Sequence, residues 1–341
     1  MSSFNDLMRK ETRVFYSEAH MLSLRFALTA ILAIVLSQSV VAQDSSTTKA
    51  VLVTGASSGI GLAITQYLAG HGFYVYAGAR KDEDLKRLNT LKNVSSVRLD
   101  VTKQADVDAA VQFVSAQGRG LFGVINNAGV ASLGDLTTTS DEDVLWQYDI
   151  NVMGPLRVNR AFFPLLKQSK GRTAIIGSLS AFLAGPGGGG YGMSKAAAEI
   201  YTETLALELA PVDVKVGIID PGAFKSRGRE KVAMKMLTGK PDLDQQLTAE
   251  QMKVFAGVQA DEAKKDDPTP VAEQTFRFLT SDRPRLHYMA ANNDQVAHLI
   301  IRTLLDRTLQ LNASQTNYTL NRDQLVKMID AALAQTKASK R

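Results

Sequence analysis

The sequence predicts an α/β protein built on one open, doubly wound parallel β-sheet with helices on both faces. From Lys49 onward, short apolar runs alternate with segments of helical spacing, and a glycine-rich segment follows the first run. The runs are apolar throughout rather than at alternate positions, which is typical of strands covered by helices on both sides. Strands joined by helices are parallel, and their ligands bind beyond the carboxyl ends of the strands.

The predicted elements follow one another in a regular order. Strands are expected at residues 50–55, 73–79, 95–101, 121–129 (running into a loop), 172–178, 214–220 and 285–290. A first helix is expected to end at Gly70 or Gly72, and further helices to cover residues 103–118, 141–167, 191–210 and 293–311. The segment 141–167 is expected to be one long helix with a kink at Pro155, because proline cannot donate the backbone hydrogen bond of a helix interior.

Residues 49–311 are expected to form a single domain with one interruption. Residues 224–268 are polar and break the alternation, which predicts a lid-like insertion over the substrate site. Residues 312–341 are expected to form a polar C-terminal extension, amphipathic and helical around residues 323–334.

Composition excludes several classes of protein. The chain of 341 residues has a net charge of +5, but its lysines and arginines are scattered. A nucleic-acid binder concentrates such charge in a patch, so we expect no nucleic-acid partner. The chain has no cysteine, which excludes disulfides and thiolate chemistry. Its four histidines are dispersed without ligand-like spacing, so no metal site is predicted.

A glycine-rich segment, TGASSGIG, lies between the first strand and the first helix at residues 54–61. Glycine permits a tight turn and a close approach of the backbone to a pyrophosphate, and the N-terminus of the following helix attracts phosphates. The segment therefore predicts a dinucleotide site, although a simple strand–helix turn needs glycine as well.

The end of the second strand predicts which dinucleotide is bound. Enzymes that prefer NAD usually carry an acid there, which binds the ribose 2′-hydroxyl. This chain has Ala79 followed by Arg80, and a guanidinium can clamp a 2′-phosphate. We therefore expect NADP rather than NAD, with Lys81 as an assisting cation; the alternative is an arginine that only faces solvent.

The pair Tyr191 and Lys195 predicts acid–base chemistry. Residues four apart lie on the same face of a helix, so the ammonium group is expected beside the phenol. A free phenol has a pKa of about 10, and a neighbouring cation lowers that pKa toward the range in which a proton is exchanged at neutral pH. A tyrosine and a lysine at this spacing often occur by chance. The pair indicates a catalytic site only when further catalytic residues accompany it.

Two further residues are expected to complete the site. Ser178 ends a predicted strand, so its hydroxyl is placed to bond a substrate carbonyl, with Ser180 as a neighbouring rival. Asn151 is a poor helix former within the predicted long helix, and its apolar neighbours indicate that it is at least partly buried.

These segments together resemble the short-chain dehydrogenase/reductase family. TGASSGIG, NNAG at residues 126–129, Ser178 thirteen residues before Tyr191, YGMSK and IIDPG at residues 218–222 match the family in order and spacing. The resemblance covers residues 49–226 and continues more loosely to Leu311. The stretches GLFGVINNAGV, LALELAPVDVKVGIIDPGAF and RPRLHYMA look most similar to hydroxysteroid and retinol dehydrogenases.

The resemblance implies a Rossmann-type fold and a role for each site residue. Tyr191 would be the general acid/base, Lys195 would lower its pKa and bind the nicotinamide ribose, and Ser178 would hold the substrate carbonyl. Asn151 would position a water that links Lys195 to solvent. The glycine-rich segment would bind the pyrophosphate, and other loops would bind the adenine, its ribose and the nicotinamide. The implied cofactor residues are Gly55, Ser57, Ser58, Gly59, Ile60, Gly61, Arg80, Asp100, Val101, Asn127, Ala128, Gly129, Tyr191, Lys195, Pro221, Gly222 and Ser226.

Two departures from the family pattern concern the substrate side. Ser226 stands where threonine is frequent, and it keeps the hydroxyl. The run Pro186–Gly190 contributes almost no side chains just before Tyr191, so a wide or adaptable pocket is expected. The implied reaction is hydride transfer between NADP(H) and a carbonyl or alcohol of a lipophilic, steroid-, retinoid- or lipid-like substrate.

The N-terminus carries an uncharged, mostly apolar run at residues 26–42, preceded by Arg25. Small residues at its end and polar residues after it are typical of a secretory signal peptide. An uncleaved membrane anchor and a helix packed on the domain are the alternatives, since the run is short for a membrane span. We expect residues 1–42 to make the protein membrane-associated or exported. A cytoplasmic location is the alternative, because a diffusible nicotinamide cofactor is a cytosolic resource.

Other functions remain open from the sequence. The fold could serve as a non-catalytic NADP-binding or scaffolding module at a membrane, although the intact set of four site residues argues against this. Within the family, a reductase of ketoacyl thioesters or of sugars is the alternative. A basic protein that binds lipid headgroups is a third hypothesis. The family resemblance also implies a homodimer or homotetramer formed through the helices at residues 141–167 and 191–210.

Overall fold

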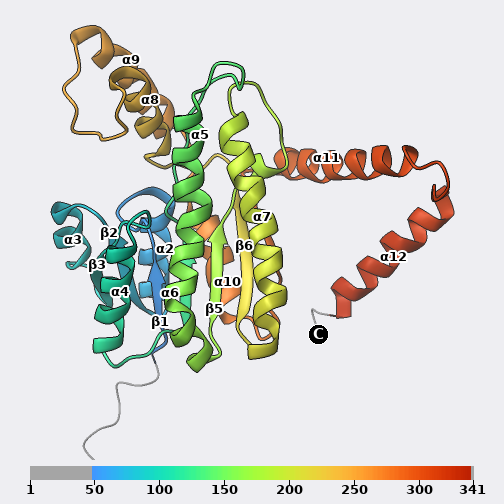
Figure 1. Cartoon of the computed structure of the whole chain (residues 1–341), viewed down its shortest axis with the longest axis horizontal. Coiled ribbons are helices and arrows are strands. Elements are labelled where there is room, and N and C mark those ends of the chain that lie inside the picture. Colours follow the sequence, from blue (N-terminus) through green and yellow to red (C-terminus); the bar gives the residue numbers. More distant parts are fainter. Residues whose placement is uncertain (1–47, 339–341) are drawn as a thin grey trace, which may run out of the picture. The chain divides into compact units, whose positions relative to one another are not determined.

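The computed structural model describes residues 48–338, so the apolar segment at residues 26–42 lies outside the described residues. Seven parallel strands form one sheet in the order β3-β2-β1-β4-β5-β6-β7 (Figure 1). The strand order reverses between β1 and β4, which places the ligand crevice at their carboxyl ends. The predicted doubly wound fold is confirmed. The strands are β1 (Ala50–Val53), β2 (Tyr74–Ala79), β3 (Val94–Arg98), β4 (Gly123–Asn126), β5 (Arg172–Ile176), β6 (Lys215–Pro221) and β7 (His287–Ala290).

Helices join the strands, and several of them were not predicted from the sequence pattern. The helices are α2 (Gly59–Gly70), α3 (Asp82–Leu88), α4 (Gln104–Ala116), α5 (Asp141–Tyr148), α6 (Gly154–Ser169), α7 (Gly189–Leu209), α8 (Gly228–Thr238), α9 (Ala249–Ala263), α10 (Thr269–Thr280), α11 (Asp294–Ala313) and α12 (Arg322–Ala338). The unpredicted α3 is short and mostly charged, so it has no apolar stripe. The unpredicted α10 directly follows the lid segment, and it buries Val271 and Phe278.

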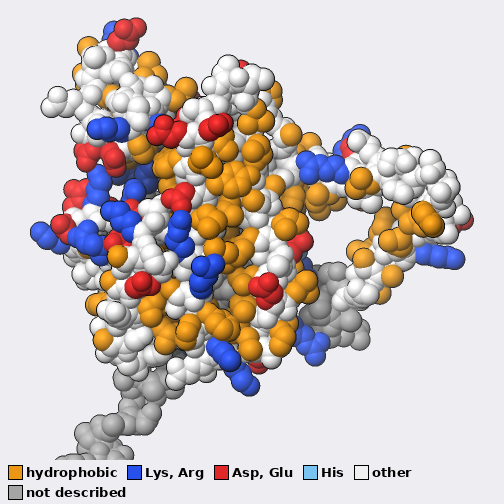
Figure 2. Space-filling model, in the orientation of Figure 1, with side chains coloured by type: hydrophobic (Ala, Val, Ile, Leu, Met, Phe, Trp, Pro, Cys, Tyr) orange, Lys and Arg blue, Asp and Glu red, His pale blue; other side chains and the backbone are white. Residues whose placement is uncertain are grey.

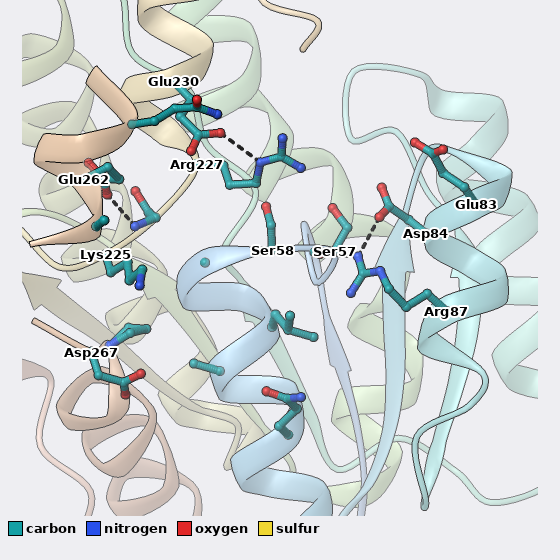
Figure 3. Close-up of a pocket in the computed structure, with 18 residues that line it drawn as sticks. Ser57, Ser58, Glu83, Asp84, Arg87, Lys225, Arg227, Glu230, Glu262 and Asp267 are labelled. Atoms are coloured by element: carbon teal, nitrogen blue, oxygen red, sulfur yellow. Dashed lines mark hydrogen bonds and ion pairs between the residues drawn. The ribbon is translucent and has the colours of Figure 1, made fainter. Parts of the chain in front are cut away.

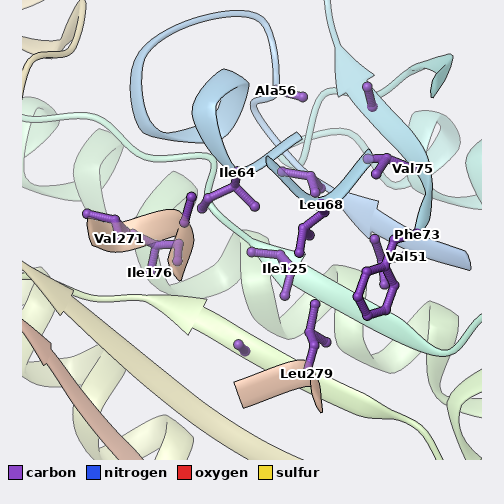
Figure 4. Close-up of a cluster of buried hydrophobic side chains, with 14 of the residues drawn as sticks. Val51, Ala56, Ile64, Leu68, Phe73, Val75, Ile125, Ile176, Val271 and Leu279 are labelled. Carbon is purple, nitrogen blue, oxygen red and sulfur yellow. The ribbon is translucent and has the colours of Figure 1, made fainter. Parts of the chain in front are cut away.

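Two apolar layers hold the helices onto the sheet. Alternate residues of β1 face opposite sides, as the period of a strand requires. Val51 and Val53 pack with α2 and α10 on one face, where Figure 4 shows Ile64 and Leu68 meeting the sheet. Leu52 packs with α4 and α6 on the other face. Helices therefore cover both faces, and the core fixes the ends of the strands where ligands bind.

The segment predicted as one long helix is divided into three parts, which corrects the prediction. A π-helical turn at Asp149–Met153 separates α5 from α6. Pro155 lies in the first turn of α6 and has no N–H, so it cannot donate the α-helical hydrogen bond to the carbonyl of Asn151. A π-turn is the local solution, and such turns are frequent at functional sites. Asn151 lies within this turn.

The predicted lid segment contains α8 and α9, which pack against each other. A capping box at Thr248 and Gln251 begins α9. Lys81, after β2, donates to Asp244 of this segment at 2.7 Å, and this bond raises the pKa of Lys81. The segment is therefore tied to the carboxyl edge of the sheet.

The C-terminal residues continue the helical pattern. The predicted helix at residues 293–311 is α11, and the predicted helical part of the extension is α12. Asn293 caps α11 by accepting a hydrogen bond from the N–H of Val296. Within residues 48–338, no helix has both the length and the apolar character needed to cross a membrane.

Candidate active site

Tyr191 and Lys195 lie on one face of the first two turns of α7. The Lys195 side chain is buried, with the residue 6% exposed, and its Nζ donates to the carbonyl of Ile176 at 2.8 Å. The same Nζ lies 5.7 Å from the centroid of the Tyr191 ring. A hydrogen bond to the end of β5 therefore fixes the cation beside the phenol. Among residues 48–338, Nζ has no second hydrogen-bond acceptor, so its two other N–H bonds are available to a ligand.

Ser178 lies just beyond β5 and is buried. It caps the short 3₁₀ turn at Leu179–Ala181, where its Oγ accepts from the N–H of Ser180 at 3.1 Å. Its own N–H donates to Oδ1 of Asp220 at 2.9 Å. The hydroxyl hydrogen of Ser178 is thereby left to donate to a ligand. Ser180, the alternative candidate, instead holds the Ser178 hydroxyl through its backbone N–H.

Asn151 ties three parts of the site together. Its Oδ1 accepts from the N–H of Val130, and its Nδ2 donates to the carbonyl of Val130 and to Oγ of Ser194, each at 2.9 Å. Ser194 in turn donates to the carbonyl of Tyr191 at 2.8 Å. The π-turn, the loop after β4 and the start of α7 are therefore held in one arrangement by a side chain that is 2% exposed.

The glycine-rich turn has the shape of a phosphate cradle. Gly55 and Gly59 have φ angles of 64° and 55°, which side chains other than glycine rarely adopt. A Cβ added to Gly61 would lie 2.3 Å from both Nδ2 of Asn127 and the carbonyl oxygen of Gly55. The side chain of Ser58 does not cap α2, so the first N–H groups of this helix are left to an anion. These residues fit a dinucleotide pyrophosphate.

The NNAG segment braces this cradle. Nδ2 of Asn127 donates to the carbonyls of Thr54 and Gly55, and the N–H of Ala128 donates to Oγ1 of Thr54. A Cβ on Gly129 would lie 3.7 Å from Nζ of Lys195. The loop therefore connects the predicted pyrophosphate site to the catalytic candidates.

The residues predicted for the adenosine half lie at the ends of β2 and β3. Arg80 is half exposed and pairs with Asp100 at 3.8 Å. Oδ1 of Asp100 also accepts from the N–H and the hydroxyl of Thr102. A Cβ on Gly154 would lie 2.8 Å from Val101, so Val101 packs against the start of α6. Arg80 is therefore near the predicted adenine residues and open to a further anion.

The residues after β6 link the lid to the glycine-rich turn. The N–H of Ser226 donates to Glu262 of α9 at 2.5 Å, and a Cβ on Gly59 would lie 3.0 Å from Ser226. A Cβ on Gly222, which follows Pro221, would lie 2.1 Å from Oδ1 of Asn292. The structure thus places Ser226 against the glycine-rich turn.

A cavity of about 780 Å³ opens between the glycine-rich turn, α3 and the lid (Figure 3). Ser57, Ser58, Gly59 and Ser226 line it among the predicted cofactor residues, whereas none of the four catalytic candidates does. Ion pairs between Arg87 and Asp84 and between Arg227 and Glu230 border it. The cavity therefore lies beside the glycine-rich turn and not among the four catalytic candidates.

The glycine run before Tyr191 has two different roles. A Cβ on Gly189 would lie 2.6 Å from Leu136, and one on Gly190 would lie 3.0 Å from Nε2 of Gln147, so these two glycines allow close packing at the start of α7. A Cβ added to Gly187, in the first part of the run, would have no neighbour within 4 Å. Only the first part of the run leaves open space, which limits the predicted widening of the pocket.

Sequence reasoning missed the buried Asp220. It is 3% exposed at the end of β6, and burial together with the neighbouring Glu199 raises its pKa well above the usual range. The sequence feature that could have revealed it is an acidic residue at the end of a mostly apolar strand, VKVGIID. Ser194, inside YGMSK, was missed because a serine on a helix usually faces water.

The family model described as short chain dehydrogenase matches residues 49–236, which contain the glycine-rich turn and all four catalytic candidates. The chain belongs to this family. It is 34% identical over 191 residues to the mitochondrial D-beta-hydroxybutyrate dehydrogenase of Bos taurus, covering 53% of this chain and 56% of the relative. It is 37% identical over 196 residues to the human 17-beta-hydroxysteroid dehydrogenase type 2, covering 52% and 47%. The chain thus spans about half the length of these curated relatives.

Solved structures of family members carry nicotinamide cofactors. A short chain dehydrogenase/reductase from Burkholderia phymatum in complex with NAD has a TM-score of 0.65 and 25% identity, covering 79% of this chain and 97% of that one. A short chain dehydrogenase from Burkholderia cenocepacia in complex with NADP has a TM-score of 0.59 and 25% identity, covering 78% and 96%. The fold of this dehydrogenase family member is therefore one that holds NAD or NADP in those proteins.

Proposed function

We propose that this protein is an NADP(H)-dependent oxidoreductase that transfers hydride between the nicotinamide and a carbonyl or alcohol group, with Tyr191 as general acid/base. The observation that carries the proposal is the buried Lys195, whose Nζ is fixed to the carbonyl of Ile176 beside the Tyr191 ring. A buried cation with unused donors is costly unless a ligand or a reaction uses it. Family membership supports the same conclusion.

The residues divide the chemistry among them. The bound nicotinamide supplies or accepts the hydride. In reduction, Ser178 donates its hydroxyl hydrogen to the substrate carbonyl oxygen, and Tyr191 gives its phenolic proton to that oxygen. Lys195 supplies positive charge beside the phenol and would donate to the cofactor ribose. Asn151 holds Val130 and the start of α7 in place. We also propose that Asn151 positions a water that links Lys195 to solvent.

Arg80 is proposed to select NADP. Its guanidinium is half exposed, and its contact with Asp100 is long, so it is free to clamp a 2′-phosphate. Gly55, Ser57, Ser58, Ile60 and Gly61 would hold the pyrophosphate, Asp100 and Val101 the adenine, Asn127, Ala128 and Gly129 the adenosine ribose, and Pro221, Gly222 and Ser226 the nicotinamide carboxamide.

Replacing Arg80 with glutamine is expected to weaken NADPH binding by about 10–100-fold, because a hydrogen bond to a charged group contributes about 1.5–3 kcal/mol. NADH binding should change little. Calorimetric titration of both cofactors measures this, and Lys86→Gln is the matched control because Lys86 is exposed on α3 and loses the same charge. Equal loss for both cofactors would contradict the assignment of Arg80.

A lipophilic substrate is proposed from the surface beside Tyr191. Leu133, Leu136 and Met193 are each about half exposed, and Leu136 reaches Gly189 at the start of α7. On the lid, Met234 is buried in the core, whereas Met236 is exposed. Apolar side chains that remain exposed around a catalytic tyrosine favour a steroid-, retinoid- or lipid-like substrate.

Turnover tests the function directly. The full chain is mixed with NADPH or NADH and with steroid, retinoid, simple ketone and aldehyde substrates, and nicotinamide absorbance is followed. Loss of NADPH with a lipophilic carbonyl is the expected result. Activity confined to ketoacyl thioesters or sugars would establish the alternative within the family. Tight NADPH binding without any turnover would establish a binding or scaffolding module.

A homodimer or homotetramer is proposed from the exposed face of α5, α6 and α7. Figure 2 shows hydrophobic side chains gathered over these helices. Ile200 and Leu207 lie two turns apart on α7 and are 62% and 78% exposed. Neighbouring Leu145 and Met153 are also exposed. An apolar face of this kind on paired helices is typical of an interface between copies.

Ile200→Lys is expected to convert the oligomer to a monomer, because a charge buried without a partner opposes association. Sedimentation at micromolar concentration measures the change. Met236→Lys, a similarly exposed position on α8, should leave the oligomer intact. A wild-type monomer under the same conditions would contradict the proposed interface.

Membrane association or export through residues 26–42 remains a proposal, and no membrane-spanning helix is found within residues 48–338. Fractionation of cells that express the full chain and a chain without residues 1–42 tests it. Both forms in the soluble cytoplasmic fraction would favour the cytoplasmic alternative.

A further inference from the structure

A line of buried acids runs from the catalytic candidates to the surface behind them. Oδ1 of Asp220 accepts the N–H of Ser178 at 2.9 Å. A Cβ on Gly177 would lie 2.0 Å from this Oδ1, so glycine at position 177 is required for the contact. Asp220 therefore fixes the peptide that carries the Ser178 hydroxyl, although nothing in the reaction itself uses Asp220.

The second carboxyl group in this line is Glu199, one turn after Lys195 on α7. The residue is 6% exposed, and within residues 48–338 neither of its side-chain oxygens has a hydrogen bond of ordinary length and geometry; its contact with His287 is a longer ion pair. Burial and the neighbouring Glu199 raise the pKa of Asp220 well above the usual range. Two neighbouring buried carboxylates repel each other, which favours a proton on one of them.

His287, at the start of β7, faces the outer side of this pair. Its Nδ1 lies 3.4 Å from Oε2 of Glu199, and its Nε2 lies 3.5 Å from Oε1 of Glu203. The contact with Glu199 is the largest cause that raises the pKa of His287. Since His287 is half exposed, the imidazolium balances the charge of Glu199 at the surface end of the line. The positive charge of Lys195 acts on Asp220 from the other side and opposes the rise of its pKa.

A metal ion is the competing explanation, because ligand atoms of Glu199, Glu203 and His287 all lie within 4.8 Å of one another. The imidazole, however, directs its two nitrogens to two different carboxylates. A single ion can take only one of these nitrogens, whereas an imidazolium donates from both. The geometry at this cluster favours a proton over a metal ion.

We propose that Asp220 is a positioning residue for Ser178: it is protonated, donates its proton to the Glu199 carboxylate, and holds the Ser178 N–H with its other oxygen, while His287 balances the charge of Glu199. This assignment rests on the proposed role of Ser178 in the reaction. It predicts that the site needs a neutral group at position 220, so that asparagine, which also donates and accepts, can replace the acid.

Infrared spectroscopy tests whether Asp220 is protonated, and it requires no substrate. The wild-type protein at neutral pH is expected to show a carboxylic-acid C=O stretching band that disappears in Asp220→Asn. Asp213→Asn is the matched control, because Asp213 is an exposed aspartate whose pKa is lowered by its hydrogen bond to Lys215. Absence of the band from wild-type protein would overturn the proposal, whatever the enzyme's substrate is. A stoichiometric zinc ion retained by the purified protein and lost in His287→Gln would overturn it as well.

Turnover tests the positioning role. Asp220→Ala is expected to lower kcat by about 10²-fold, as displacement of a catalytic group by about 1 Å does, with little change in NADPH binding. Asp220→Asn is expected to recover most of that loss. An alanine variant as active as wild type, or an asparagine variant as impaired as alanine, would overturn the role. If wild-type protein turns over no substrate, the proposed function fails. The infrared result then still decides whether Asp220 is protonated.

The pH dependence of stability tests the proposed role of His287, at the surface end of the line of buried acids. Because the pKa of His287 is raised in the folded protein, its contribution to stability is fully present below the ordinary value and is lost as pH rises through the raised value. The Tm difference between wild-type protein and His287→Gln should therefore be present at mildly acidic pH and vanish at alkaline pH. A difference that grows with pH would overturn the charge balance proposed for Glu199.

Discussion

Replacing Tyr191 with phenylalanine is expected to lower turnover by about 10²–10⁴-fold, the range that general acid–base catalysis contributes. The substitution removes only the phenolic oxygen, so α7 and the anchoring of Lys195 at the Ile176 carbonyl should persist. NADPH binding should therefore change little. Steady-state kinetics on the best substrate, together with calorimetric titration of NADPH, measures both quantities.

A matched control uses another tyrosine of the same helix. Tyr201 is half buried on α7, and its hydroxyl accepts a hydrogen bond from Nδ2 of Asn159. Tyr201→Phe removes an equivalent hydroxyl away from the site, and it should leave turnover close to that of wild-type protein. Equal losses for the two variants would mean that the Tyr191 hydroxyl has no special part in the reaction, and the proposed mechanism would be wrong.

Replacing Gly61 with alanine is expected to abolish cofactor binding and to destabilise the fold by about 1–3 kcal/mol, as overpacking does. The added Cβ would lie 2.3 Å from both the Asn127 side chain and the carbonyl oxygen of Gly55, and the carbonyl cannot move without moving the turn. Thermal unfolding and NADPH titration measure the two effects.

Gly70→Ala provides the control in the same helix. Gly70 ends α2, and a Cβ there would have no neighbour within 4 Å. Alanine has a better helix propensity than glycine, so this variant should be as stable as wild-type protein or slightly more so, and it should bind NADPH normally. Normal cofactor binding by Gly61→Ala would show that the glycine-rich turn is not the pyrophosphate site.

The sequence predicted the sheet well because strands and helices have different periods of apolar residues. The runs before Thr54 and after Lys215 stand out as strands, and the glycine-rich segment marks the first turn. The long helix was wrong in detail, because the π-turn around Asn151 depends on where Pro155 falls in the helix rather than on apolar spacing. A short charged helix such as α3 carries no periodic signal at all.

The candidate site was predicted in parts. Tyr191 and Lys195 were singled out because their spacing places them on one face of a helix, and Ser178 because it ends a predicted strand. Asp220 was not found, because its importance depends on β6 lying beside β5, which brings it to the Ser178 N–H. The partner Glu199 comes from a third element, α7. Contacts between residues distant in the sequence become visible only when the sheet order is known.

Deuterium transfer tests the central claim most directly. The full chain is incubated with NADPH that carries deuterium at the reactive carbon of the nicotinamide and with the panel of carbonyl substrates, and the products are analysed by mass spectrometry. We predict one deuterium on the carbinol carbon of a lipophilic product. We also predict that Tyr191→Phe forms little of this deuterated product. Products without deuterium, or no reaction with any carbonyl although NADPH binds, would contradict the assignment of this chain as an oxidoreductase.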